Sequence, residues 1–180
     1  PAQVCYCSEA FSAVNFNHPD APKLSLLSAA LRNGYLHSAI REKGGAYGSG
    51  ASNEPSAEVF RFFSYRDPNC KDTFDHFKKS IEWLDTNLGQ QNLDEAVLNV
   101  ISSIDKPLSP SGEAKVDFYG TLNGKSHEDL VAFRDGVLNT NISDIKRVTE
   151  KYLMQDSFKS VVAGEKFDQE MSDLRLEKLN

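Results

Sequence analysis

Apolar residues recur at helical spacing along most of this 180-residue chain and alternate with other residues in a few short segments. Intervals of three and four residues between apolar positions are typical of helices that bury one face. In the segment 23–41, these intervals join Leu24, Leu27, Leu31 and Tyr35. The same spacing predicts further helices over about 69–88, 92–105, 111–122, 126–138 and 141–153.

Polar residues three positions apart mark where most of the later helices are expected to begin. Such a pair satisfies two of the backbone N–H groups that a helix start leaves free. The sequence contains four of these pairs, which are Asn69 with Asp72, Asn92 with Glu95, Ser126 with Asp129, and Asn141 with Asp144. We therefore expect capped helix starts at these four positions.

Strands are predicted at about 4–17, 57–65 and 158–163. The second of them carries large side chains on both faces, with Val59, Phe63 and Tyr65 on one face and Phe60 and Phe62 on the other. A strand with bulk on both sides is typical of a sheet that is covered on both faces. The glycine-rich run 44–50 ends the first helix and leads into a strand.

The order of these elements is strand, helix, strand pair, several helices and a last strand. No internal repeat, low-complexity stretch or linker divides the chain, so residues 1–180 are expected to form a single domain. The order predicts an α+β fold, an α/β sandwich in which helices cover a mainly antiparallel sheet.

Composition and charge narrow the possible partners. The chain is 39% hydrophobic and 26% charged, carries a formal net charge of −6 and has a pI of about 5.2, which is ordinary for a globular protein. Nucleic-acid binding is not expected, because no basic face is available to neutralise phosphates. No apolar run reaches the roughly 18–20 residues of a membrane span, so no membrane partner is expected either. Because the chain starts abruptly at Pro1, we expect it to be part of a longer protein, and the compartment cannot be read from it.

The histidines and cysteines predict no metal site and no catalytic residue in this chain. None of the four histidines stands in H-E-x-x-H or H-x-x-E-H, the spacings that place two imidazoles on one helical face around zinc. Cys5 and Cys7 form a lone C-x-C, which lacks the second pair of a zinc site and is expected to pack on one face of a strand.

The segment from Arg41 to Tyr47 supports two interpretations. In the first, the glycines simply stop a helix and Tyr47 is a strand residue. In the second, Gly44 and Gly45 let another backbone approach, while the Arg41 guanidinium and the Tyr47 phenol converge on one peptide carbonyl. That pair would suit binding of an extended peptide and stabilisation of charge on a scissile oxygen, and His37 could line the same site.

Two stretches resemble a known family. The run 35–48, YLHSAIREKGGAYG, and the run 62–69, FFSYRDPN, are similar to the C-terminal half of presequence proteases. These are zinc metallopeptidases of the pitrilysin/insulysin type, the inverzincins, and are related to falcilysin. The stretches IDKP at 104–107 and KYL at 151–153 agree in order, so the resemblance covers most of the chain.

The resemblance implies a peptidase in which two homologous halves close around a peptide chamber. The N-terminal half would hold the zinc and the general base, so no catalytic residue, zinc ligand or other cofactor site is assigned to this chain. Arg41 and Tyr47 stand where the family places residues that reach the substrate. The implied partners are an unstructured peptide, such as a cleaved targeting presequence, and the N-terminal catalytic half. The implied location is the mitochondrial matrix or the cytoplasm, and this chain alone is expected to be inactive.

Two other functions remain open at this point. One is a non-catalytic scaffold, like the core subunits that use this fold structurally. The other is a stand-alone peptide-binding module. Presence of both Arg41 and Tyr47 favours the peptidase over the scaffold, because a scaffold needs neither residue.

Overall fold

A computed structural model describes residues 3–167 of the chain. Within that range, four strands and six α-helices are joined by short turns, a π-helix and a 3₁₀ turn. In chain order they are β1 (Cys5–Ser12), α1 (Ala21–Leu31), the π-helix η1 (Arg32–Lys43), β2 (Gly48–Glu54), β3 (Val59–Asp67), α2 (Lys71–Asn87), α3 (Gln90–Ile104), α4 (Pro110–Leu122), α5 (His127–Leu138), α6 (Ile142–Leu153), β4 (Phe158–Val162) and η2 (Glu165–Phe167). This is the predicted α+β architecture.

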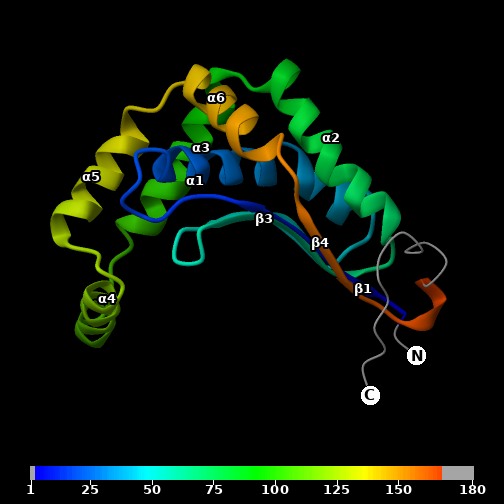
Figure 1. The fold of residues 1–180 in the computed structure, drawn as a ribbon, viewed down its shortest axis with the longest axis horizontal. Coiled ribbons are helices and arrows are strands. Elements are labelled where there is room, and N and C mark those ends of the chain that lie inside the picture. The colour runs from blue at the N-terminus through cyan, green and yellow to red at the C-terminus, as the bar shows by residue number, and fades with distance from the viewer. Residues whose placement is uncertain (1–2, 168–180) are drawn as a thin grey trace.

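The four strands form one antiparallel sheet in the order β2-β3-β1-β4. The helices arch over one face of this sheet, and no helix of residues 3–167 covers the opposite face (Figure 1). Phe60 and Phe62 of β3 are fully buried on the helix side, whereas Tyr65 is 40% exposed. The prediction that both faces of the sheet are covered is therefore wrong for the described part of the chain. Bulky residues on the second face leave a broad, partly apolar surface facing outward.

The core lies between the sheet and the helices. Phe62 stacks on Phe77 of α2, with ring centroids 5.3 Å apart, and packs edge-on against Phe60. From α1, four buried leucines enter the same layer, which are Leu24, Leu26, Leu27 and Leu31. Burying each of these large side chains contributes on the order of 1.5–3 kcal/mol. No helix within residues 3–167 is long and apolar enough to cross a membrane.

The predicted first helix exists but changes its winding halfway. Regular α-helix ends at Leu31, and the chain continues as π-helix to Lys43. Its last turn shows the wider i to i−5 pattern, because the Gly44 N–H donates to the Ala39 carbonyl at 3.1 Å. Apolar spacing could not indicate this change, since both windings place residues three to five positions apart on one side.

Two of the four expected helix caps form as predicted. Ser126 and Asn141 each accept from the backbone N–H three residues later, with Asp129 and Asp144 completing the boxes. The other two are corrected by the structure, because α2 begins after Cys70 and α3 after Gly89. Asn69 and Asn92 are polar and near the right place, but other contacts use their side chains.

Those two asparagines have clear roles. The Asn92 side chain reaches back to accept from the Gly89 N–H at 3.0 Å, so it is the third helical residue and not the cap. The Asn69 amide donates to the Gly44 carbonyl at 2.6 Å and ties the start of α2 to the glycine turn.

Candidate functional site

The C-terminal part of the π-helix presents a small polar group to solvent. Arg41 is exposed, and its guanidinium lies 3.2 Å from Nε2 of His37. The Nδ1 atom of the same imidazole lies 3.4 Å from a carboxylate oxygen of Glu42. One ring thus contacts the residues four and five positions ahead, which the wide winding of η1 brings to one side. His37 is therefore in contact with Arg41, and its role in lining a peptide site stays a prediction.

The turn that follows is held by its own backbone and by Asn69. Gly45 adopts φ of +80°, a conformation that side chains disfavour. Its N–H donates to the Arg41 carbonyl at 3.1 Å, and the next N–H, of Ala46, donates to the Ile40 carbonyl. With the Asn69 amide on the Gly44 carbonyl, the turn has a defined path from helix to strand. The backbone path from Arg41 to Tyr47 is therefore fixed by a structured turn.

Tyr47 leaves this turn with its side chain 63% exposed. Its ring lies 5.5 Å from the ring of Tyr65, centroid to centroid. The guanidinium of Arg66 lies 5.6 Å from the centre of the Tyr47 ring, and the Arg66 carbonyl accepts from the Tyr47 N–H at 3.3 Å. The ring is therefore held by neighbours on β3 while the side chain stays largely open to solvent.

Gly48, the first residue of β2, makes room for this arrangement. It pairs with Tyr65 across the β2–β3 ladder. A Cβ at this position would lie 2.2 Å from Cε1 of the Tyr65 ring, which no side chain could tolerate without moving the ring. Glycine here lets Tyr65 lie close against the strand next to Tyr47.

The structure thus places the predicted residues at one end of the sheet. His37 and Arg41 are in contact, Gly44 and Gly45 form the turn, and Tyr47 follows it. Among the described residues, no hydrogen bond joins the side chains of Arg41 and Tyr47. Their convergence on one substrate carbonyl therefore stays a prediction.

Two residues of this site were missed at the sequence level. Tyr65 and Arg66 lie within the 62–69 run that carried the family resemblance, but no role was assigned to them. An exposed aromatic residue followed by arginine is a weak signal, because it acquires meaning only when the strand is paired. Here the pairing of β2 with β3 brings both residues to Tyr47.

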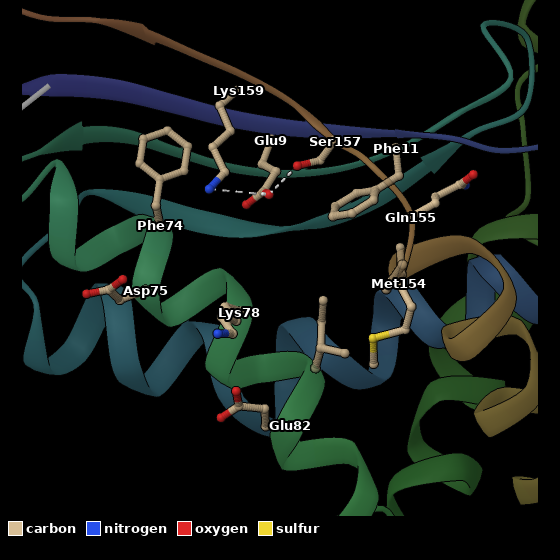
Figure 2. Close-up of a pocket in the computed structure, with 12 residues that line it drawn as sticks. Glu9, Phe11, Phe74, Asp75, Lys78, Glu82, Met154, Gln155, Ser157 and Lys159 are labelled. Carbon is tan, nitrogen blue, oxygen red and sulfur yellow. Dashed lines mark hydrogen bonds and ion pairs between the residues drawn. The ribbon is translucent and has the colours of Figure 1, made fainter. Parts of the chain in front are cut away.

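A groove of about 380 Å³ lies elsewhere, between α2 and the β1–β4 edge (Figure 2). Glu9 is almost buried there and accepts from Ser157 Oγ at 2.6 Å, with Lys159 Nζ at 3.8 Å. Phe11 and Phe74 supply apolar walls. None of the five predicted site residues lines this groove, so the candidate site is the open surface around Tyr47.

A family model described as the PreP C-terminal domain matches residues 1–164. The chain belongs to the PreP C-terminal domain family. The match covers most of the chain and includes both stretches that carried the resemblance.

Relatives of this PreP C-terminal domain are mitochondrial presequence proteases. That of Saccharomyces cerevisiae is 39% identical over 166 residues, which is 91% of this chain and 16% of the relative. That of Emericella nidulans is 39% identical over 170 residues, 93% of this chain and 16% of the relative. That of Drosophila melanogaster is 38% identical over 157 residues, 86% of this chain and 15% of the relative. The matched part of this chain therefore spans about a sixth of the length of these relatives.

Solved structures show the same fold at low identity. A protease from Helicobacter pylori superimposes with a TM-score of 0.72 at 21% identity, over 90% of this chain and 41% of that one. The M16 peptidase inactive domain from Pseudomonas fluorescens gives 0.66 at 19% identity, over 89% and 41%. A chain of complex III from Candida albicans gives 0.74 at 14% identity, over 88% and 42%.

Catalytic zinc does not fit the described part of this PreP C-terminal domain. In residues 3–167, the one group of three or more potential metal ligands is Cys5, Cys7 and Cys70, and all three are buried. A catalytic zinc site needs an open position for water and substrate, which a closed group of thiols does not provide. No step of peptide hydrolysis is therefore assigned to a metal held by these residues.

Proposed function

We propose that this chain is the substrate-binding C-terminal part of a larger zinc endopeptidase that degrades unstructured peptides, such as cleaved targeting presequences. The observation that carries the proposal is that Arg41, near the end of η1, and Tyr47, beside the uncovered sheet face, are both exposed on either side of one turn. The names of the relatives support a mitochondrial location, for which we propose the matrix, and presequence peptides as substrates. Zinc and the general base would come from another part of the polypeptide, and the chain alone would cleave no peptide.

In this proposal the two residues do different work. The Arg41 guanidinium, oriented by His37, holds a backbone carbonyl of the bound peptide through charge-assisted hydrogen bonds. The Tyr47 phenol donates to the scissile oxygen as negative charge develops on it. The uncovered sheet face beside Tyr65 gives an extended peptide a surface to lie on.

The helix α4 supports the existence of further protein beside this chain. None of its residues is buried, and four of its large side chains are more than half exposed, which are Val116, Phe118, Tyr119 and Leu122. An isolated soluble protein rarely leaves such a helix uncovered. Because relatives are about six times longer than the region matched, we assign the cover to another part of the same polypeptide.

A non-catalytic scaffold is the second candidate, because a chain of complex III shares this fold. That likeness is at 14% identity and concerns the fold alone. A scaffold gives no reason for His37 to contact Arg41, or for Tyr65 and Arg66 to hold an exposed Tyr47 after the same turn. We therefore rank the peptidase function first.

Photo-crosslinking in the full-length protein tests substrate binding directly. Benzoylphenylalanine replaces Tyr47 in one variant and Met154, which is also 63% exposed but lies beside the groove at the end of α6, in a matched control. The proposal predicts that an unstructured presequence peptide crosslinks at position 47 and not at position 154. Equal crosslinking at both positions, or none at position 47, would contradict it.

A further inference from the structure

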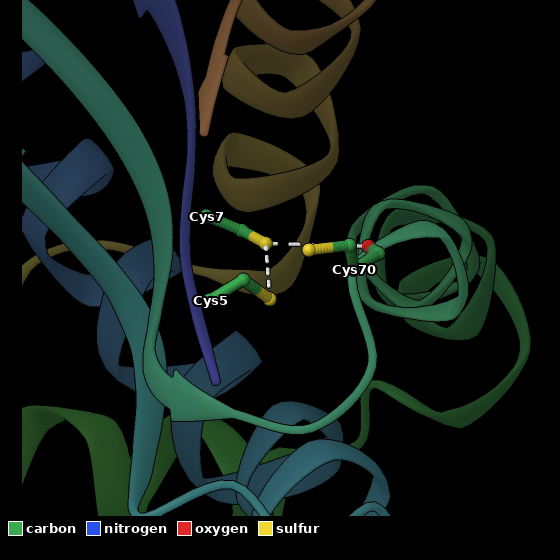
Figure 3. Close-up of side chains that lie close together, drawn as sticks. All are labelled: Cys5, Cys7 and Cys70. Atoms are coloured by element: carbon green, nitrogen blue, oxygen red, sulfur yellow. Dashed lines mark hydrogen bonds between the residues drawn. The ribbon is translucent and has the colours of Figure 1, made fainter. Parts of the chain in front are cut away.

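The three cysteines of the chain gather at one end of the sheet, although Cys70 is far from the other two in sequence (Figure 3). Their Sγ atoms all lie within 4.8 Å of one another, and those of Cys5 and Cys7 are 3.6 Å apart. All three residues are buried, with Cys5 0%, Cys7 2% and Cys70 0% exposed. The sequence predicted packing on one face for the first two and gave no reason to bring in Cys70.

An irregularity in the sheet assembles this cluster. Cys7 pairs with Ser64, but Cys5 pairs with Asp67, so β3 contains one residue more than β1 between these pairs. Such a bulge sharpens the local bend of the strand. The bend directs the end of β3 toward the start of α2, where Cys70 lies directly before the first helical residue.

We propose that Cys5, Cys7 and Cys70 form a three-thiolate binding site for a soft monovalent cation, of which cuprous copper is the biological example. An ion about 2.3 Å from each sulfur in a trigonal plane requires sulfurs about 4 Å apart. The observed separations, up to 4.8 Å, need only small side-chain shifts. Three soft sulfurs favour Cu(I) over harder ions.

Within residues 3–167, no fourth histidine, cysteine or carboxylate joins the three sulfurs as a zinc ligand would. Asp67 is the nearest buried carboxylate in the register, but both of its oxygens are used. Oδ1 accepts from the Asn69 N–H at 2.9 Å, and Oδ2 accepts from the Thr73 hydroxyl at 2.7 Å. Since structural zinc almost always takes four ligands, a closed set of three sulfurs disfavours zinc.

A buried hydroxyl beside the cluster lacks the acceptor that a thiolate would supply. Ser64 is 3% exposed, and its Oγ makes no hydrogen bond within the described residues. Because directly paired residues of an antiparallel ladder point to the same face, Ser64 and Cys7 share the helix side of the sheet. A metal-bound thiolate at Cys7 would accept the Ser64 O–H and satisfy it, as outer partners of metal ligands commonly do.

The start of α2 offsets part of the cost of forming thiolates here, since the Cys5 hydrogen bond, burial and Asp67 all raise the pKa of the Cys7 thiol. Cys70 is the residue before the first turn of this 17-residue helix, where free backbone N–H groups favour negative charge. Entry of the ion requires only local opening, because Cys5 is the first residue of β1. Strand ends open at lower free energy than the core.

Anaerobic titration of the purified chain with Cu(I), in competition with a chromophoric Cu(I) chelator, tests the site. We expect one equivalent to bind, to protect all three thiols from alkylation, and to raise Tm because the ion binds the folded state. No uptake, or uptake that lowers Tm by favouring the unfolded chain, would overturn the proposal and leave the cysteines as packing residues.

A pair of serine variants distinguishes a built site from chance proximity of thiols. Ser64→Ala keeps all three sulfurs and should weaken Cu(I) binding about 10–100-fold, the usual effect of removing such a partner. Ser80→Ala is the control, since Ser80 is fully buried on α2 and donates to the Phe77 carbonyl. Equal Cu(I) affinity in the two variants would contradict the assigned role of Ser64, and binding that survives Cys7→Ala would contradict the three-sulfur site.

Discussion

Arg66 has a backbone conformation that few arginines adopt. Its φ is +49°, in the left-handed region, where a side chain normally costs on the order of 1 kcal/mol. The residue sits in the β3 bulge, and its guanidinium packs over the Tyr47 ring. Strain of this kind persists where the surrounding structure over-determines it, often at functional sites. We infer that Arg66 is a positioning residue for Tyr47.

Arg66→Gly separates the backbone role of this residue from its side-chain role. Glycine relieves the left-handed strain, so the free energy of unfolding should stay equal or rise by up to about 1 kcal/mol. Loss of the guanidinium should free the Tyr47 ring and lower kcat for peptide cleavage by the full-length protein several-fold. Steady-state kinetics and thermal melting measure the two effects.

Glu58→Gly is the matched control for that variant. Glu58 has φ of +54° in the turn between β2 and β3. It should gain similar stability with unchanged kcat. A fall of kcat in both variants, or in neither, would remove the positioning role of Arg66.

Only the part of this site that lies in one continuous segment could be predicted from the sequence. Arg41 and Tyr47 could be identified because the glycines between them predict a turn that joins a helix to a strand. Tyr65 and Arg66 join them through strand pairing, and Arg66 owes its conformation to a bulge between distant segments. Local spacing contains no information on such pairing. For the same reason, the approach of Cys70 to Cys5 and Cys7 could not be predicted from the sequence.

Among the elements, α1 and α6 are joined by one buried carboxylate. Asp20, directly before α1, accepts from Arg147 Nη2 at 2.6 Å, Lys151 Nζ at 3.0 Å and Tyr152 Oη at 2.8 Å, all from α6. Burial by itself raises the pKa of Asp20, but these three donors outweigh it and hold the pKa well below the usual value. The contact ties the first helix to the last one across more than 120 residues of chain.

Asp20→Asn should destabilise the fold by about 1–3 kcal/mol at neutral pH, because it removes a charged acceptor from three donors. The pKa of Asp20 is lower in the folded chain than in the unfolded chain, where it is about 3.9. The contribution is therefore complete above about pH 5 and is lost as the pH falls below about 4. Denaturant unfolding measures this. The free energy of unfolding should fall less between pH 7 and pH 3 for Asp20→Asn than for wild type.

Asp105→Asn serves as the control for a surface ion pair. Asp105 binds Arg134 at 3.0 Å, but both side chains are more than 40% exposed. Its replacement should change stability and pH dependence little, since exposed pairs contribute little. An Asp105→Asn variant as unstable as Asp20→Asn would show that burial is not what gives the Asp20 contact its strength.

Element positions were predictable where the signal was local. The Ser126 and Asn141 capping boxes fixed two helix starts, because such caps depend on four consecutive residues. The strand β2 received no bounds of its own, since its sequence GSGASNE has no apolar alternation. It is a strand because β3 pairs along its whole length. The π-helix could not be predicted, because the apolar spacing in this segment fits an α-helix and a π-helix equally well.

At the scale of the whole molecule, two surfaces are exposed and are each assigned a partner. One is the open sheet face beside Tyr47, and the other is α4, which stands apart from the sheet at the far end of the helical layer (Figure 1). Phe118 and Leu122 of α4 are 60% and 65% exposed. We assign the first surface to peptide and the second to the rest of the polypeptide.

Substitution of both α4 residues tests the second assignment. Phe118→Lys with Leu122→Lys should leave Tm of the isolated chain nearly unchanged, because no core contact is lost. It should destabilise the full-length protein, measured by denaturant unfolding. Unchanged stability of the full-length variant would show that α4 stays exposed there.

We propose that Tyr47 acts on the transition state of peptide cleavage, and the kcat of Tyr47→Phe in the full-length protein is the decisive measurement of this role. A phenol donor to a developing oxyanion contributes mainly to the transition state, so its loss should lower kcat by about 10²–10³-fold and change KM much less. Arg41→Ala should change both, since a charged donor also holds the ground state. The measurement uses a short fluorogenic peptide alongside metal analysis, and zinc content should be unchanged in both variants. A Tyr47→Phe enzyme with wild-type kcat would contradict the account and leave Tyr47 an exposed strand residue.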